Sequence, residues 1–300
     1  MERRKLILGA GALALGLSAF PTEWAAAKGA RKRHILFYTR SQNFQHSVVR
    51  RKEGAALGFA EQIVTDLGSK HGFDVTCTKD GTVFTPGNLK KYDAFFFYTT
   101  GDLTKEGEDN APPMTAAGKQ AFLDAVRSGK GFIGSHCASD TFHTQPDERY
   151  KNHGSEVDPY IAMLGGEFIR HNDQQNSTMR VIDSKFPGLS GAGASFVRFE
   201  EWYSLKEFSP DLHVILVQET EGMKGPDYQR PSYPATWARK HGKGRVFYTS
   251  MGHREEIWQD DLFQSILLGG IAYAVGNVKA DVTPNLSTAA PNASTLPVEK

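Results

Sequence analysis

Apolar and polar positions fall along the first half of the chain in blocks that predict strands and helices in turn. Short, apolar and β-rich runs predict strands at 34–39, 73–77, 92–100 and 131–134. Apolar residues at helical spacing predict helices at 53–70 and 115–128, each closed near a glycine. This alternation is typical of α/β proteins with a mostly parallel central sheet and helices on both faces.

The second half is less regular between about residues 147 and 209, where a short helix is expected from Tyr160, broken by Gly165 and Gly166. Strands are predicted at 179–183, 196–205, 212–217, 233–238 and 244–250, and a final helix at 261–275. After Val278 the chain is rich in Pro, Ser, Thr, Asn and Ala, so residues 279–300 are expected to form a disordered tail. The globular domain is therefore predicted to span residues 30–278.

The first 29 residues have the composition of an export signal. A basic stretch at 3–5 precedes an apolar run at 6–20, and the alanines at 25–27 resemble a cleavage site. Because Arg3 and Arg4 are adjacent, the signal is expected to be of the twin-arginine type and the protein to be periplasmic. An uncleaved anchor is the weaker alternative, since the apolar run is short for a membrane span and no later segment is long enough.

The net charge and the cysteine content of the chain narrow the range of possible functions. Lys and Arg number 35 against 34 Asp and Glu, giving a net charge of +1. Without a broad basic field, a nucleic-acid partner is not expected. Cys77 and Cys137 are the two cysteines. Free, buried thiols are the favoured state, although an exported protein leaves a disulfide between them open.

Histidines and carboxylates follow the predicted strands where those strands end. His46 lies after the first strand, His136 and Asp140 follow the strand in GFIGSHCASD, and His253 follows the last predicted strand. Because the carboxyl ends of parallel strands share one edge of a sheet, His46, His136 and His253 are expected to converge. Convergent imidazole and carboxylate groups are what a metal site or an acid–base site requires.

Several other polar residues allow more than one role. On the FEEWY segment, either Glu200 or Glu201 can point inward, since neighbours along a strand face opposite sides. His171 follows the broken helix in GGEFIRH and is an open candidate for function. His143 and His153 lie among charged residues, so solvated surface is the expectation for both.

Several motifs together resemble the trehalose-utilisation (ThuA-like) family. They are NFQH, YDAFFFYTTGD, GSHCASDTF, LGGEFIRH, FEEWYSL and YPATWARKHGKGRVFYTSMGH, and the similarity covers about residues 34–275. This family belongs to the class I glutamine amidotransferase-like superfamily. The resemblance therefore implies a three-layer, flavodoxin-like fold.

The superfamily comparison bears on which residue of GSHCA carries the chemistry. True amidotransferases present a nucleophilic cysteine in a tight G-x-C-x-G turn and complete it with a late H-x-E pair. Here His136 falls at the nucleophile position and Cys137 one place later, while His253 and Glu255 keep the spacing of the late pair. A shift of one residue turns a side chain elsewhere, so Cys137 is a poor candidate for a catalytic thiolate.

The resemblance implies bacterial metabolism of trehalose and related glycosides through 3-keto sugars. A ketone at carbon 3 makes the hydrogen on carbon 2 removable by a base. The glycosidic oxygen can then leave by β-elimination, and water can add. We expect His136, His253 and Glu201 to hold zinc or manganese as a Lewis acid, with acid–base roles for the same histidines and for His46 and Asp140.

The expected ligand is a saccharide, contacted by Trp202, Tyr203, Trp237 and His171, although such aromatic side chains pack in cores at least as often. No nucleotide cofactor is expected. A sugar 3-dehydrogenase upstream is the implied partner, and a homo-oligomer stays open.

Two other functions remain as alternatives. One is a non-catalytic sugar-binding protein that uses the aromatic residues above and Trp258. The other, less favoured, is residual amidotransferase or peptidase-like activity through Cys137.

Overall fold

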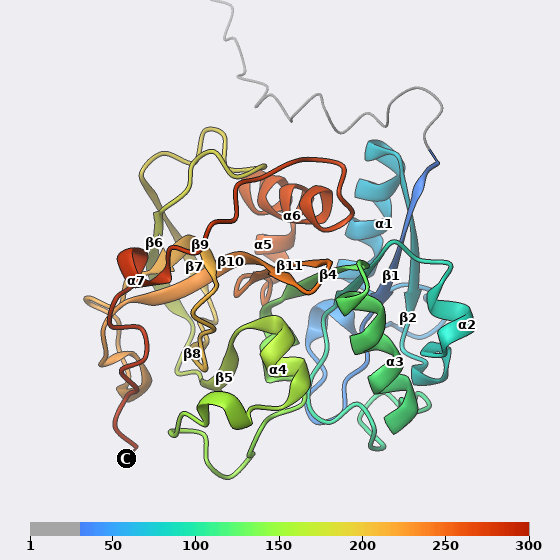
Figure 1. The fold of residues 1–300 in the computed structure, drawn as a ribbon, viewed down its shortest axis with the longest axis horizontal. Coiled ribbons are helices and arrows are strands. Elements are labelled where there is room, and N and C mark those ends of the chain that lie inside the picture. The colour runs from blue at the N-terminus through green and yellow to red at the C-terminus, as the bar shows by residue number, and fades with distance from the viewer. Residues whose placement is uncertain (1–30, 300) are drawn as a thin grey trace, which may run out of the picture.

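The computed structural model describes residues 31–299 and contains one large sheet and one small one (Figure 1). The large sheet has nine strands in the order β2-β1-β3-β4-β11-β10-β9-β6-β7, and the small one pairs β5 with β8. The strands are β1 Arg33–Tyr38, β2 Phe73–Thr78, β3 Ala94–Phe97, β4 Gly131–Ser135, β5 Glu167–Arg170, β6 Gln175–Val181, β7 Ser195–Glu200, β8 Ser204–Lys206, β9 His213–Gln218, β10 Tyr233–His241 and β11 Gly244–Thr249.

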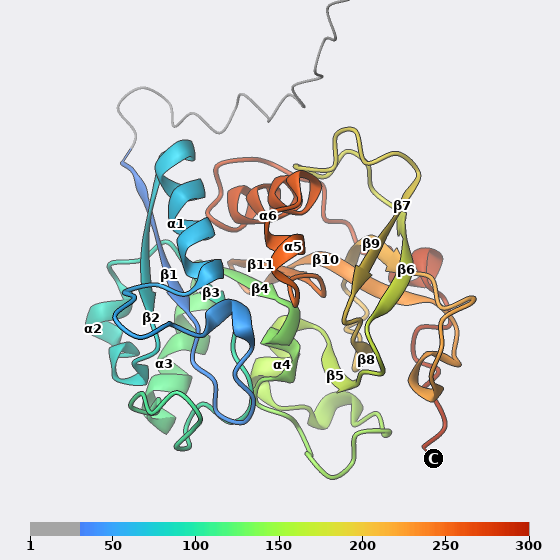
Figure 2. The ribbon, with the colours of Figure 1, turned by 180° about the vertical axis from the view of Figure 1, so that it is seen from behind.

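Helices cover both faces of the large sheet. The α-helices are α1 Phe59–His71, α2 Pro86–Leu89, α3 Ala116–Arg127, α4 Pro159–Leu164, α5 Glu255–Trp258, α6 Asp261–Ala274 and α7 Leu286–Ala289. Short 3₁₀ helices lie at Ser47–Val49, Gly81–Val83, His136–Asp140, Gly154–Glu156 and Pro226–Tyr228. Figures 1 and 2 show α1, α5 and α6 on one side of the sheet and α3 and α4 on the other. The predicted three-layer α/β fold is confirmed.

The direction of the strands decides what meets at each edge of the sheet. β2, β1, β3, β4 and β11 are parallel neighbours. The next pairs, from β11 through β10, β9 and β6 to β7, are all antiparallel. β10 and β6 therefore run against the other strands, whereas β9 and β7 run with the parallel set. The carboxyl ends of β1, β4, β11 and β7 consequently face the same way.

The parallel half is apolar because it is buried on both faces. All four residues of β3 are buried, and Phe97 stacks on Phe122 of α3 with ring centroids 4.7 Å apart. Phe132 of β4 packs against Phe97 from the neighbouring strand, at 5.3 Å. Short apolar runs in the sequence were sufficient to predict these strands.

Two predicted elements differ most from those in the structure. The helix predicted at 53–70 begins only at Phe59, because the side chain of Glu61 accepts a hydrogen bond from the Gly58 amide and caps the helix there. The strand predicted at 196–205 is two strands in different sheets, β7 and β8, separated by an irregular segment at 201–203. β5 was not predicted, because it has only four residues and two of them, Glu167 and Arg170, are charged.

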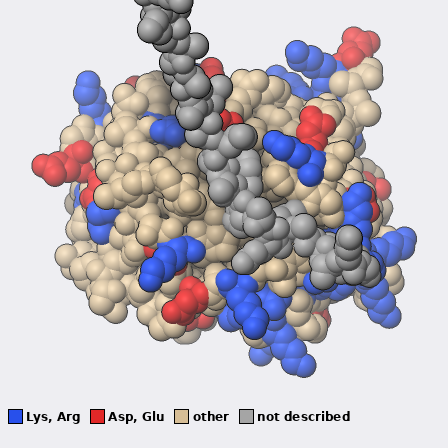
Figure 3. Space-filling view, turned by 90° about the horizontal axis from the view of Figure 1, so that it is seen from above, with Lys and Arg blue, Asp and Glu red and all other residues tan. Residues whose placement is uncertain are grey.

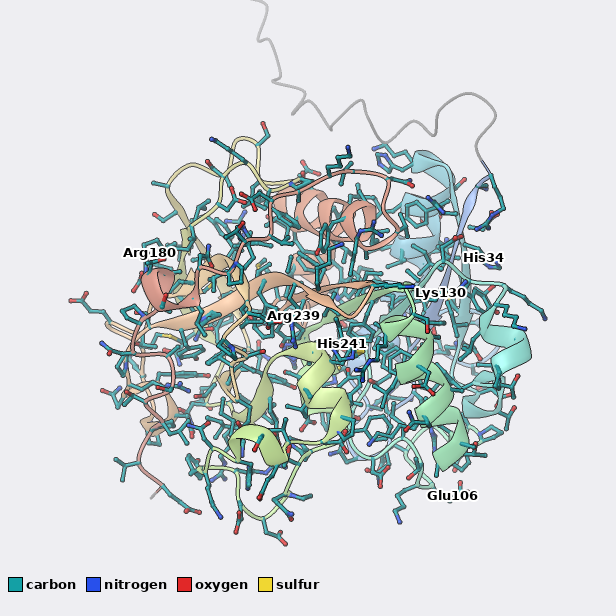
Figure 4. The ribbon with its side chains drawn as sticks, viewed as in Figure 1. His34, Glu106, Lys130, Arg180, Arg239 and His241 are labelled. Carbon is teal, nitrogen blue, oxygen red and sulfur yellow. The ribbon has the colours of Figure 1, made fainter. Side chains whose placement is uncertain are left out.

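The prediction of a disordered tail is wrong for residues 279–299. β6 pairs with β9 only at residues 216–218, and Asn285 bonds instead to the amide and carbonyl of Val214, at 2.6 and 3.1 Å. Arg180, which lies beside α7 in Figure 4, donates to the carbonyl of Ala289. Ala293 is buried, and its carbonyl accepts from Arg230. The composition of this segment suggested disorder. Its small side chains and Asn285 nevertheless pack against β9, Arg180 and Arg230.

The charge of the surface and the lengths of the described helices do not identify where in the cell the protein is located. The face seen from above carries both basic and acidic side chains (Figure 3). Among the described residues, no helix is long and apolar enough to cross a membrane. The predicted export signal at 1–29 lies outside the described residues.

Candidate functional site

Three histidines from separate loops meet at the carboxyl edge of the parallel strands. His46 precedes the 3₁₀ turn after β1, His136 follows β4, and His253 lies just after β11. The ring centroids of His46 and His136 are 5.1 Å apart, and each lies 5.2 Å from the ring of His253. The expected convergence of these residues is present, because all three loops follow strands that run in the same direction.

Glu201 completes this group from the far end of the sheet. It directly follows β7, whose carboxyl end faces the same way as β1, β4 and β11. Its Oε2 atom lies 3.0 Å from Nδ1 of His253 and 3.5 Å from Nε2 of His136. One ligand atom from each of the four residues lies within 4.8 Å of the others. We call His46, His136, His253 and Glu201 the three-histidine cluster.

The imidazoles of the cluster have nitrogen atoms that no protein group satisfies. Nδ1 of His136 donates to the carbonyl of Ser250 at 3.0 Å, so its Nε2 presents a lone pair to the cluster. Among the described residues, Nε2 of His136 and Nδ1 of His46 are buried without a hydrogen-bond partner, whereas Nδ1 of His253 lies against Oε2 of Glu201. Buried polar atoms are rarely left so, and nitrogen and carboxylate donors suit zinc or manganese. The donor set therefore fits a divalent metal.

Burial and mutual contact set the charges in the cluster. Burial lowers the pKa of His136, and burial together with the neighbouring imidazoles lowers the pKa of His46. Burial opposes ionisation of Glu201, but its contacts with His136 and His253 outweigh that effect and hold the pKa of Glu201 far below its usual value. The first two imidazoles are thus neutral and the carboxylate is charged, the forms in which each binds a metal.

The backbone around His136 is strained and firmly held. His136 has a φ of +44°, a left-handed conformation that residues with a side chain seldom adopt. Its carbonyl accepts hydrogen bonds from the hydroxyl groups of Tyr248 at 2.8 Å and Ser139 at 3.2 Å. The abrupt turn after β4 thus directs the imidazole into the cluster.

Glu200 and Glu201 have different tasks. Glu200 is fully buried, and its Oε1 accepts from the backbone amides of Gly252 at 2.7 Å and His253 at 2.5 Å. Burial, only partly offset by these two bonds, raises the pKa of Glu200 to about 7. Gly252 has a φ of +123°, which requires glycine. Glu200 therefore fixes the loop that carries His253, and Glu201 faces the cluster.

Asp140 is not part of the three-histidine cluster. Its Oδ1 lies 2.6 Å from Nε2 of His143, whose Nδ1 lies 2.9 Å from Oε1 of Glu167. We call this arrangement the His143 bridge. The side chain of His143 is buried, and that of His153 is also buried, between Glu148 and Glu207. The expectation of solvated surface for His143 and His153 is wrong, because nearby carboxylates pair with both rings inside the fold.

The predicted saccharide-stacking tryptophans are inside the core. Trp202 and Trp237 are fully buried, and their indole nitrogens donate to the carbonyls of Gln175 and Leu164. Neither ring has a face that a sugar can reach, so this prediction is wrong for both. Tyr203 is buried as well, with its ring centroid 4.1 Å from that of His136, and it backs the cluster.

His171 lies at the border between the cluster and an open cavity. Its side chain is 43% exposed, and its Nδ1 lies 3.5 Å from Oε1 of Glu201. Both residues line a cavity of about 1050 Å³. The rest of the lining is Asn172, Asp173, Gln174, Gln175, Asn176, Phe199, Gly222, Lys224, Gly225 and Pro226. We call this cavity the amide groove.

Two residues of the amide groove were missed from the sequence. Gln174 places its Nε2 atom 3.1 Å from Nε2 of His253, and Phe199 is an exposed aromatic ring. The polar run HNDQQN, which begins at His171, was the available signal for Gln174. Another cavity, of about 710 Å³, is lined by Arg33, Lys130 and Arg245, among others, and lies at the opposite edge, where the parallel strands begin.

The cysteines are free. Cys77 is half-buried and Cys137 fully buried. Burial raises the pKa of the Cys137 thiol well above its usual value, the opposite of what a nucleophilic thiolate needs.

Comparison with known proteins agrees with the fold and the motifs. The family model described as trehalose utilisation (ThuA) matches residues 34–274. No curated protein matches the chain. The structure is similar to a ThuA-like protein from Bacteroides uniformis, with a TM-score of 0.57 and 22% identity over 83% of this chain and 93% of that one. It is also similar to one from Parabacteroides merdae, with a TM-score of 0.53 and 18% identity over 87% and 97%. The chain belongs to the ThuA family of trehalose-utilisation proteins.

Proposed function

We propose that this protein is a metal-dependent enzyme of carbohydrate metabolism that cleaves 3-keto glycosides by elimination and hydration. One observation carries the proposal: ligand atoms of three imidazoles and one carboxylate lie within 4.8 Å of one another, and two of the buried imidazole nitrogens have no hydrogen-bond partner. A divalent metal bound there would act as a Lewis acid on a carbonyl or hydroxyl oxygen of the sugar. The wall of the amide groove includes Glu201, so a sugar in the groove reaches the cluster.

The chain's own residues would hold the sugar and move its protons. Removal of the hydrogen on carbon 2, acidified by the ketone at carbon 3, needs a base at the groove. His171 is suitable because its imidazole is exposed and close to Glu201. The glycosidic oxygen leaves carbon 1 with a proton, and water adds across the resulting double bond. The net reaction consumes one water and gives the free 3-keto sugar and an alcohol.

The structure changes two of the expected assignments. His46 is one of the four clustered residues, which supports a ligand role in place of a separate acid–base role. Asp140 already bonds to His143, which supports a structural role for its carboxylate.

The alternative of a non-catalytic sugar-binding protein is less favoured. Its aromatic residues were to be Trp202, Tyr203, Trp237 and Trp258, and all four are buried. A protein that only binds sugar would also not need buried imidazole nitrogens that lack hydrogen-bond partners.

The test is release of the aglycone from a 3-keto glucoside by purified protein, with and without a chelator. We expect release that the chelator abolishes and that added zinc or manganese restores. Absence of release by folded, metal-loaded protein would exclude the proposed reaction and favour the binding protein.

A further inference from the structure

We propose that the amide groove is a subsite for a second, neutral sugar ring, with Phe199 as its stacking platform, so that the substrate is at least a disaccharide. This inference rests on the proposed function, because it assigns the reacting ring to the three-histidine cluster. It replaces the buried tryptophans with an aromatic side chain that a ligand can reach.

Phe199 is exposed in a position that the core does not require. Its ring is 47% exposed and lines the groove, whereas Trp202 and Trp237 are fully buried. Its neighbour on the same face of β7, Val197, is 52% exposed but does not line the groove. An exposed aromatic ring at the wall of a polar cavity offers the flat apolar face on which the C–H side of a sugar packs.

The ring is held in place by a chain of contacts that begins at the cluster. Gln174 lies 3.1 Å from His253 through its Nε2, and its Oε1 accepts from Arg254 at 2.6 Å. The guanidinium group of Arg254 lies over the Phe199 ring, 5.1 Å from its centroid. The platform and the cluster are therefore fixed relative to each other before a ligand arrives, which reduces the entropy lost on binding.

Spacing and lining favour a second ring that carries no charge. Phe199 and Glu201 both line the groove and are two residues apart, about 7 Å along an extended chain, which is comparable to the span of one sugar ring. Four of the twelve lining residues are Asn or Gln, and their amides both donate and accept, as hydroxyl groups do. Asp173 and Glu201 outnumber Lys224, so the groove has no group of cations for a phosphate.

The test is calorimetric titration of metal-loaded protein with four sugars: trehalose, its 3-keto derivative, methyl glucoside and 3-keto methyl glucoside. We expect each disaccharide form to bind roughly tenfold or more tightly than the matching single-ring glycoside. Phe199→Ala should weaken disaccharide binding about tenfold and leave single-ring binding unchanged. Val197→Ala is the matched control, exposed on the same strand, and should change neither.

The outcomes separate this inference from the proposed function. Equal affinity for one-ring and two-ring sugars, no disaccharide binding, or full disaccharide affinity in Phe199→Ala would overturn the subsite. Failure of the proposed function would instead appear as absence of turnover, with disaccharide binding and its dependence on Phe199 intact. Circular dichroism of both variants excludes misfolding as the cause of a loss.

Discussion

Two buried groups of histidine and carboxylate each include residues from the loop after β4, and they differ in whether their ring nitrogens have partners. In the His143 bridge, both nitrogens of the ring contact a carboxylate, Asp140 on one side and Glu167 on the other. In the three-histidine cluster, one buried nitrogen of His46 and one of His136 have no hydrogen bond, and three imidazoles share the single carboxylate of Glu201. The same residue types therefore serve two purposes: a satisfied ring stabilises the fold, and an unsatisfied set offers ligand atoms.

The two groups also differ in how they are assembled. His143 and Asp140 are three residues apart in one loop, and Glu167 comes from the nearby strand β5. The cluster draws on four segments, after β1, β4, β7 and β11, and includes a left-handed backbone at His136. Strain at such a position, which costs about 1–3 kcal/mol, is typical of functional sites.

The largest difference is expected when one ring of each group is removed. His136→Ala should lower the affinity for zinc or manganese by roughly a hundredfold or more, because a buried ligand is lost. His143→Ala should leave the affinity within about twofold of wild type, because its ring does not face the cluster. Titration of chelator-treated protein followed by elemental analysis measures both. Equal losses of metal affinity in the two variants would show that the cluster and the His143 bridge do not differ as metal sites.

The next prediction concerns stability, and here the substitution of His143 should have a larger effect than that of His136. His143→Gln leaves two buried carboxylates facing a neutral side chain, which should lower the free energy of unfolding by about 3 kcal/mol. His136→Gln in metal-free protein should cost less, since that ring begins with an unpartnered nitrogen. Urea unfolding of the metal-free variants gives both values. A larger loss for His136→Gln would contradict the comparison.

A smaller effect should separate the adjacent glutamates. Glu201→Gln removes a charged ligand atom, whereas Glu200→Gln keeps an oxygen that accepts from the amides of Gly252 and His253. We therefore expect Glu201→Gln to lower metal affinity roughly tenfold more than Glu200→Gln. Isothermal titration with zinc measures the ratio. If Glu200→Gln is the more damaging substitution, the assignment of ligand and positioning roles is reversed.

The smallest expected effect is a pH dependence of the His143 bridge. Burial lowers the pKa of His143, but its bonds to Asp140 and Glu167 outweigh burial, so the net pKa is raised. Its contribution to stability is then complete below the unfolded pKa of about 6.5 and is lost as pH rises through the higher folded pKa. The melting-temperature difference between wild type and His143→Gln should narrow from pH 6 to pH 9. A difference that widens over this range would show that the ring is neutral when folded.

Local patterns predicted most of the parallel half of the sheet, and all four residues of the three-histidine cluster were among the expected site residues. Buried parallel strands are apolar runs, so β1, β3, β4 and β11 were evident, and strand direction then brought His46, His136 and His253 together. The choice of Glu201 over Glu200 had less support, because it depends on the direction of β7, which follows from four antiparallel pairings that no short pattern records. The tryptophans were misassigned because composition does not distinguish a buried indole with a carbonyl partner from an exposed one.

The most direct test of the account is thermal unfolding of chelator-treated protein with one equivalent of zinc or manganese per chain. We expect one bound metal to raise the melting temperature of wild type and His143→Gln by similar amounts, since binding at 100 times Kd stabilises by about 2.7 kcal/mol. His136→Ala, with a site weakened at least a hundredfold, should show a much smaller rise. An equal rise in His136→Ala, or no metal binding by folded wild type, would contradict the claim that the unpartnered imidazoles form a metal site.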